Sequence, residues 1–267
     1  MGFISLLKEA LDELVRNPKL FLPKLVSVTL YIPPYLMLGR ITVDIARNPA
    51  MATPAMFDQT TYIMIVLLAL APVWIFIDSM YPILVQQRIE KGRLDFKGAA
   101  QHVLGKFLKI LAVSILISIL LTAVNLPFIA LISIGLVLKL LPLLAIGLLG
   151  ALAVVFASAI FLYFVPTTLI IEKIGVVDAF KTGYALSRNN FGLVFWLTLA
   201  SFVVLLLGFY VEGVFGKIGE IGFIVGRYLG GILTVYLYVI NPTAYLEIRK
   251  SAPMEKPAER IKLAKKK

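Results

Sequence analysis

The chain has 267 residues, of which 60% are hydrophobic and only 15% are charged, and its mean hydropathy is +0.94. A soluble domain is about 45–50% apolar and about 25% charged, so this composition excludes an ordinary water-soluble fold and indicates helices that face lipid. The net charge of +11 would suggest nucleic acid in a soluble protein, but here the basic residues lie between apolar runs, so no nucleic-acid partner is expected. The absence of cysteine excludes disulfides and thiolate chemistry.

Residues 2–16 predict an amphipathic helix. Phe3, Leu7, Leu11 and Leu14 recur at helical spacing, with acidic and basic residues between them. Such a helix lies in the membrane interface or packs on its own protein. Two similar segments, residues 86–109 and 172–190, occur later in the chain.

The apolar runs predict an all-α membrane protein with six transmembrane helices, since a bilayer core about 30 Å thick needs about 20 apolar residues in a helix. A polar loop is expected at residues 39–61 and a Gly-rich turn at residues 212–221. The expected spans are residues 20–38, 62–85, 110–132, 140–168, 191–211 and 222–245.

The lysines and arginines predict the orientation. Of the 26, 21 fall in the N-terminal segment up to Lys24, in the two later amphipathic segments and in the stretch after residue 246. The opposite side has only Arg40, Arg47, Lys139 and Lys217. Because cytoplasmic loops carry the excess of Lys and Arg, we expect a multi-pass protein of the cell membrane with both termini in the cytoplasm. The basic tail, residues 251–267, and the rest of this face are expected to contact anionic lipid headgroups.

Three prolines near the ends of the even-numbered spans mark an internal repeat: Pro82, Pro166 and Pro242, spaced by 84 and 76 residues. Each lacks an N–H and frees the carbonyl four residues earlier, so the three either kink their helices or open a polar ring. Residues 1–250 are thus predicted to form one six-span domain. It would contain three parallel hairpin repeats, each preceded by an amphipathic cytoplasmic helix, at about residues 1–88, 89–172 and 173–250.

Polar and small residues inside the spans give the candidate sites. Asp78 is the one acid expected well inside a span, where it serves as a substrate or ion contact or as a structural hydrogen-bond partner. Asn125, two residues before Pro127, is a second candidate contact or a kink residue. Arg227 is expected to be ion-paired or to snorkel. A close helix contact, within the chain or in a homo-oligomer, is predicted by the stripe Gly222, Gly226 and Gly230.

The sequence contains few residues or motifs that could support catalysis. His102 is the only histidine, and no nucleotide-binding, zinc-protease or serine-hydrolase motif is present, so no catalytic residue, metal or cofactor is predicted. The leading hypothesis is a membrane protein that binds or transports a small or lipidic substrate. The alternatives are a scaffold or partner subunit and, third, a membrane-embedded enzyme.

Residues 165–199 carry a recognisable order of residues: Pro166, Glu172, Gly175, Ala179, Ala185 and then Asn190-Phe191 at the next span. This order resembles six-span membrane proteins of unknown function that are common in archaea. It is also similar to the membrane domain attached to some bacterial glycerophosphodiester phosphodiesterases. The resemblance implies a six-span fold and carries no catalytic residues.

Overall fold

The computed structural model describes residues 2–47 and 53–251, and the regular secondary structure within these residues is entirely helical. The all-α prediction is therefore confirmed. Six helical stretches are long and apolar enough to cross a membrane, as a multi-pass membrane protein requires. The elements are α1 (Phe3–Arg16), η1 (Pro18–Phe21), α2 (Leu22–Arg47), α3 (Pro54–Asp78), α4 (Tyr81–Lys91), α5 (Phe96–Val137), α6 (Leu141–Leu162), α7 (Val165–Ile171), α8 (Val176–Asn189), α9 (Phe191–Gly216) and α10 (Glu220–Ser251).

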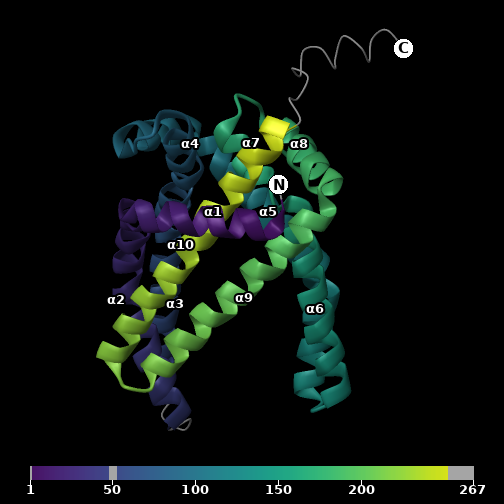
Figure 1. Ribbon diagram of the computed structural model, residues 1–267. Coiled ribbons are helices and arrows are strands. Elements are labelled where there is room, and N and C mark those ends of the chain that lie inside the picture. Colours follow the sequence, from purple (N-terminus) through teal and green to yellow (C-terminus); the bar gives the residue numbers. More distant parts are fainter. Residues whose placement is uncertain (1, 48–52, 252–267) are drawn as a thin grey trace.

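The spans pair as antiparallel helices. The α5–α6 and α9–α10 pairs turn at one end of the molecule, which we call the hairpin end, and α4, α7, α8 and the last turns of α10 lie at the other, the α4–α7 end (Figure 1). The two turns contain Lys139 and Gly219, which both have positive φ. Helix α9 stays beside α10 and diverges from α6 towards the hairpin end (Figure 1). Large apolar side chains are exposed along all six spans, as expected where hydrocarbon replaces water.

Three predicted boundaries were wrong. The expected polar loop at residues 39–61 is largely helical, because α2 continues to Arg47 and α3 begins at Pro54, a residue favoured in a first helical turn. The segment 86–109 is not a separate helix: its start belongs to α4 and its remainder opens the 42-residue α5. At about 1.5 Å per residue α5 is roughly 60 Å long, so it extends well past the hydrocarbon. The predicted turn at 212–221 begins later, since α9 continues to Gly216.

The three repeat prolines behave in two ways. Pro82 and Pro166 each stand at the start of a new helix, so α3 is separated from α4 and α6 from α7 by two residues. Pro242 lies inside α10, which continues through it. Of the two predicted roles, a kink within one continuous helix does not describe Pro82 or Pro166. Proline has no N–H, and a first-turn residue has no intrahelical acceptor for one, which is why proline is tolerated at the start of a helix.

The segments that follow the prolines form the centre of the core. Helices α4 and α7 contact each other and the last turns of α10, and the three contribute fully buried side chains such as Leu84, Leu169 and Tyr245. Lys106 of α5 donates to the carbonyls of Leu169, Ile170 and Glu172, at 3.2, 2.8 and 2.5 Å. These carbonyls end α7, where a cation is favoured by the helix dipole.

Helix α1 lies across the bundle, roughly perpendicular to the spans (Figure 1). It buries Leu6, Ala10 and Leu14 on one face and contacts α9 and α10, while Ile4 and Val15 are exposed. Partial burial, followed by repulsion from Glu247, raises the pKa of Glu9 above its usual value. The position of α1 fits either predicted role, in the interface or against the protein.

Candidate functional site

A cavity of about 700 Å³ lies where helices from all three pairs converge. Its walls come mainly from α2, α3, α7, α9 and α10, with Ser114 as the contribution of α5. Pro82, Pro166 and Pro242 all line it, so the three sequence positions that define the repeat meet around one space. The main polar lining residues are Lys24, Ser27, Tyr31, Asp78, Tyr163, Ser201, Glu212, Arg227, Tyr238 and Asn241.

Helix α2 presents one stripe to the cavity. Lys24, Ser27, Tyr31 and Tyr35 follow one another at spacings of three and four residues, which places them on one helix face. The stripe approaches α10 closely at Gly231, where a methyl group would lie 2.7 Å from a methyl carbon of Val28. Only glycine therefore allows the α2–α10 contact that closes this wall of the cavity.

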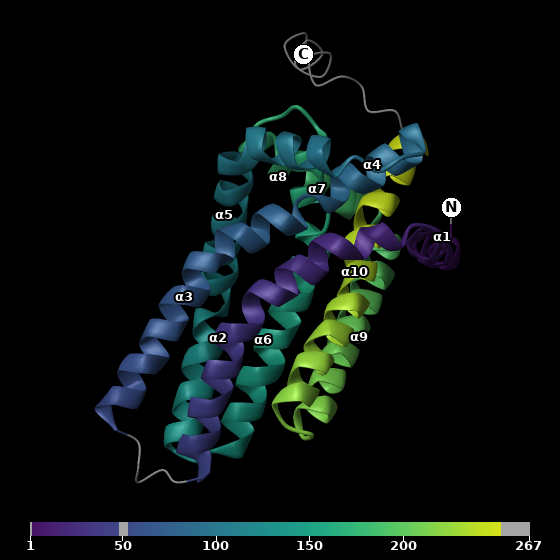
Figure 2. The same cartoon turned by 90° about the vertical axis from the view of Figure 1, so that its left-hand side faces the viewer.

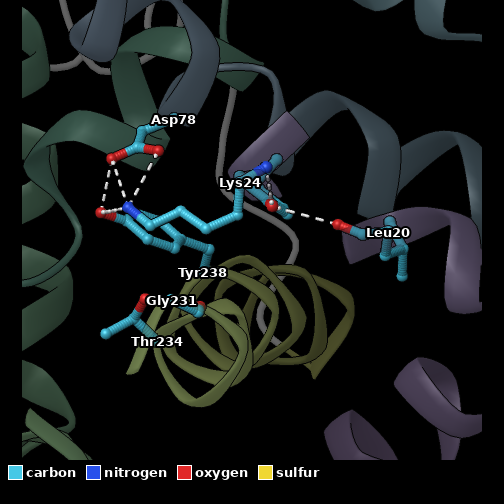
Figure 3. A network of polar contacts seen from close by, with 7 residues as sticks. Leu20, Lys24, Asp78, Gly231, Thr234 and Tyr238 are labelled. Carbon is cyan, nitrogen blue, oxygen red and sulfur yellow. Dashed lines mark hydrogen bonds and ion pairs between the residues drawn. The ribbon is translucent and has the colours of Figure 1, made fainter. Parts of the chain in front are cut away.

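A buried ion pair occupies the end of the cavity nearer the α4–α7 end. Lys24 Nζ lies 3.5 Å from each carboxylate oxygen of Asp78 and 3.3 Å from the hydroxyl of Tyr238, which itself donates to Asp78 at 2.5 Å (Figure 3). The side chains of Lys24 and Asp78 are only 9% and 14% exposed. Charges taken out of water need such a partner, because an isolated buried ion is far less stable.

Aromatic rings surround the ammonium group of Lys24. Its nitrogen lies 5.1 Å from the ring centre of Trp74 and 4.6 Å from that of Tyr238. Tyr81 stacks on Tyr238, with ring centres 5.1 Å apart. The Tyr81 hydroxyl donates to the carbonyl of Leu20 and accepts from the backbone N–H of Lys24, at 3.0 and 3.2 Å. It therefore pairs an N–H in the first turn of α2, a donor that has no partner within its own helix.

A second ion pair lies towards the hairpin end of the same cavity. Arg227 of α10 is 3.1 Å from Glu212 of α9, and its guanidinium lies 4.0 Å from the ring centre of Tyr35. Arg227 is thus ion-paired, one of the two roles expected for it. Glu212 was expected in a turn and instead lies inside the α9 span, so Asp78 is not the only acid within a span.

A third polar group joins the cavity to the broken α6–α7 helix. The Asn241 side chain donates to the carbonyl of Tyr163 at 2.8 Å and accepts from the hydroxyl of Thr167. The break at Tyr163 and Phe164 opens the helical ladder, and Asn241, the residue before Pro242, supplies a donor there. The residue before the third repeat proline therefore supplies a side-chain donor to the backbone at the second.

The structure separates the two candidate contacts. Asp78 lies in the cavity, whereas Asn125 lies outside it and donates to the carbonyl of Leu121 in its own helix. Gly222, Gly226 and Gly230 face α9 of the same hairpin: added methyl groups would lie 2.1 Å from the Phe215 carbonyl, 3.0 Å from the Glu212 Cα and 2.8 Å from the Glu212 carboxylate. The neighbour of the stripe is therefore in the same chain.

Lys24 and Tyr238 were missed as site residues. Lys24 was counted as a charge of the N-terminal segment, although its position within an apolar run was a usable signal. Tyr238 gave no such signal, because tyrosine is common near membrane interfaces. Its contact with Asp78 joins residues 160 positions apart.

The arrangement can bind a molecule that has a polar group and an apolar body. Most of the lining is apolar, and the two ion pairs stand near opposite ends of the space. Among the described residues, no group of three or more His, Cys, Asp or Glu side chains could hold a metal ion. Comparison with protein-family models, curated proteins and solved structures finds no match for this chain.

Proposed function

We propose that this membrane protein binds, and moves across or within the bilayer, a small or lipidic substrate held in the cavity between its helix pairs. The observation that carries this proposal is the Lys24–Asp78 pair on the wall of a space of about 700 Å³. Ligand sites in proteins are typically apolar cavities of about 300–1,000 Å³ with a few convergent polar groups. A structural ion pair alone would need no such space beside it.

The same proposal includes three parallel repeats related around the cavity. Supporting it, each helix pair ends in one of the cavity-lining prolines, and the segments after them pack on one another. Figure 2 shows α2 and α3 spread apart, the α9–α10 pair to one side of them, and α5 and α6 behind α2. A site between repeats can change its access when one pair tilts against another.

The proposed orientation places the α4–α7 end in the cytoplasm, as the basic residues indicate. Lys91, Lys97, Lys106 and Lys109 all lie in α4 or the first turns of α5. Anionic headgroups are the proposed lipid partners of this end and of the basic tail, of which residues 252–267 lie outside the described residues. A relationship to the archaeal six-span proteins is proposed on residues 165–199 alone.

A cavity-filling substitution tests the proposal. The protein would be extracted from its host membrane in mild detergent, and the small molecules and lipids that remain bound would be measured by native mass spectrometry. Ser201→Phe places a ring inside the cavity, whereas Ala153→Phe places the same ring on an exposed face of α6. We expect one molecular class to be enriched on the wild-type protein and on Ala153→Phe, and to be lost from Ser201→Phe.

Equal amounts bound to all three proteins, in the proportions of the bulk membrane, would contradict the proposal. The chain would then be better described as a scaffold or partner subunit. Folding of each variant is checked by its thermal unfolding midpoint in the same detergent.

A further inference from the structure

The cavity opens sideways towards the hydrocarbon. Near the hairpin end its lining residues come from α2, α9 and α10. Leu205 and Phe209 of α9 line the cavity and are also 39% and 65% exposed. These two residues therefore form the rim of the opening. An apolar chain lying in the bilayer can pass this rim without crossing water.

The closed end of the cavity has the chemistry of an ammonium site. Asp78 supplies a negative charge, Tyr238 supplies a hydroxyl oxygen, and the rings of Trp74 and Tyr238 lie within about 6 Å, the range of cation–π attraction. A primary ammonium group, that of Lys24, already occupies this cage. The cage therefore fits a primary ammonium because it contains one.

Lys24 is held loosely in the cage. Its three polar contacts are 3.3–3.5 Å long, whereas a charge-assisted N–H···O bond is typically about 2.7–2.9 Å. An incoming cation with shorter contacts can replace it. Because Lys24 lies in the first turn of α2, next to the α4–α7 end, the exchange would move its ammonium towards the headgroups at that end.

Resting on the proposed function, we propose that the substrate is an amphiphile with a primary ammonium head. The head displaces the Lys24 ammonium from Asp78, Tyr238 and Trp74, and the apolar chain lies along Leu205 and Phe209. Lys24 acts as a tethered competitor that fills the cage when the substrate is absent. The site then never contains an unpaired carboxylate.

An anionic head fits this end less well. It would have to take Lys24 away from Asp78, and the carboxylate would remain buried with only neutral hydrogen-bond partners, such as the Tyr238 hydroxyl. Breaking a buried pair in that way is strongly unfavourable, because one charge is left uncompensated. When a substrate ammonium replaces that of Lys24, Asp78 stays paired throughout and the Lys24 charge moves to the interface.

The fluorescence of Trp74 reports whether an amphiphile occupies the cage around Asp78. The chain has two tryptophans, and Trp196→Phe leaves Trp74 in the cage as the only one. In this background, in phosphatidylcholine nanodiscs, quenching of Trp74 fluorescence is titrated with three dodecyl amphiphiles brominated near the head. Their heads are a primary ammonium, a sulfate and a neutral maltoside.

We expect the ammonium amphiphile to quench most strongly. Lys24→Met should raise its affinity about tenfold or more, which corresponds to removing about 1.4 kcal/mol of competition, and Asp78→Asn should lower it by a similar factor. Glu220→Gln, which alters an exposed acid outside the cavity, should leave it within about twofold. The gain in Lys24→Met cannot come from misfolding, so the inference stays testable if Asp78→Asn does not fold.

Stronger quenching by the sulfate, or a loss of ammonium affinity in Lys24→Met, would overturn the inference. Equal quenching by all three heads in every variant would also overturn it, while leaving an amphiphile-binding cavity intact. No quenching by any amphiphile would sink the proposed function as well.

Changing the nanodisc lipid shows which kind of molecule supplies the ammonium head. Replacing phosphatidylcholine with phosphatidylethanolamine in the nanodiscs adds a lipid whose head carries a primary ammonium. Competition with the probe would assign the site to an aminophospholipid, and unchanged probe affinity would assign it to a free long-chain amine. Both results support an ammonium site.

Discussion

At the scale of single residues, the site depends on one charge pair and the groups that keep it inside the bundle. Asp78 could be selected from the sequence because a carboxylate in an apolar run requires a partner. That partner, Lys24, precedes it by 54 residues, and Tyr238 follows it by 160. Only the packing of α2 against both α3 and α10 brings them together, and no local pattern encodes that packing.

Asp78→Asn should lower stability markedly. It leaves the Lys24 ammonium buried without a counter-charge, and breaking a buried pair costs about 3–5 kcal/mol. The measurement is the thermal unfolding midpoint in one detergent. Arg40→Gln is the matched control, because its pair with Glu220 is more than half exposed and should leave the midpoint unchanged.

The double variant Lys24→Met/Asp78→Leu should recover most of the stability lost in Asp78→Asn, because two apolar side chains replace two paired charges. A double variant less stable than Asp78→Asn would show that the residues act through other contacts.

At the scale of elements, periodicity and length located the six spans but not how the helices end. Pro82, Pro166 and Pro242 look alike in sequence, yet two of them start new helices and the third lies inside one. The deciding contacts are tertiary, such as the Asn241 amide on the Tyr163 carbonyl. Boundaries were missed for a related reason. Helices α2 and α9 continue past their apolar runs and α5 begins before its own, because no proline interrupts these extensions.

Asn241→Ala should destabilise the α6–α7 junction by about 1–3 kcal/mol, since the Tyr163 carbonyl loses its donor. Asn125→Ala is the control, because Asn125 is also buried but bonds only within its own helix and has an unpaired side-chain oxygen. We expect it to be neutral or stabilising. Equal losses in unfolding midpoint would refute the assigned role of Asn241.

Gly226→Ala should loosen the α9–α10 hairpin, because the new methyl group would lie 3.0 Å from the Glu212 Cα. Overpacking of this kind typically costs about 1–3 kcal/mol. On the facing helix Gly213 has nothing within 4 Å, so Gly213→Ala should gain up to about 1 kcal/mol of helix propensity. Opposite shifts in the unfolding midpoint are the expected result, and shifts of the same sign would count against the tight crossing.

At the scale of the whole molecule, composition was enough to identify the solvent. A chain that is 60% hydrophobic, with exposed apolar side chains along all six spans, requires hydrocarbon around it. The cavity could not be read from composition, because it exists only where residues from α2, α3, α4, α5, α7, α9 and α10 meet. The repeat spacing of Pro82, Pro166 and Pro242 was the sequence signal nearest to it, since all three line that space.

Orientation is tested with single cysteines, which the natural chain lacks. In intact cells a membrane-impermeant thiol reagent should label Lys139→Cys at the hairpin end and leave Lys91→Cys at the α4–α7 end unlabelled until the cells are opened. The reverse pattern would invert the proposed topology.

The central claim is that a mostly apolar cavity with ionic groups in its wall lies open to small molecules inside a lipid-embedded bundle, and cysteine reactivity at Ser201 tests it most directly. A thiol reacts as its thiolate, which forms readily only where water reaches it. In proteoliposomes a small charged thiol reagent should modify Ser201→Cys at least about tenfold faster than Ala153→Cys on the lipid-exposed face of α6. Equally slow reaction at both positions would show a dry, closed bundle and contradict the account.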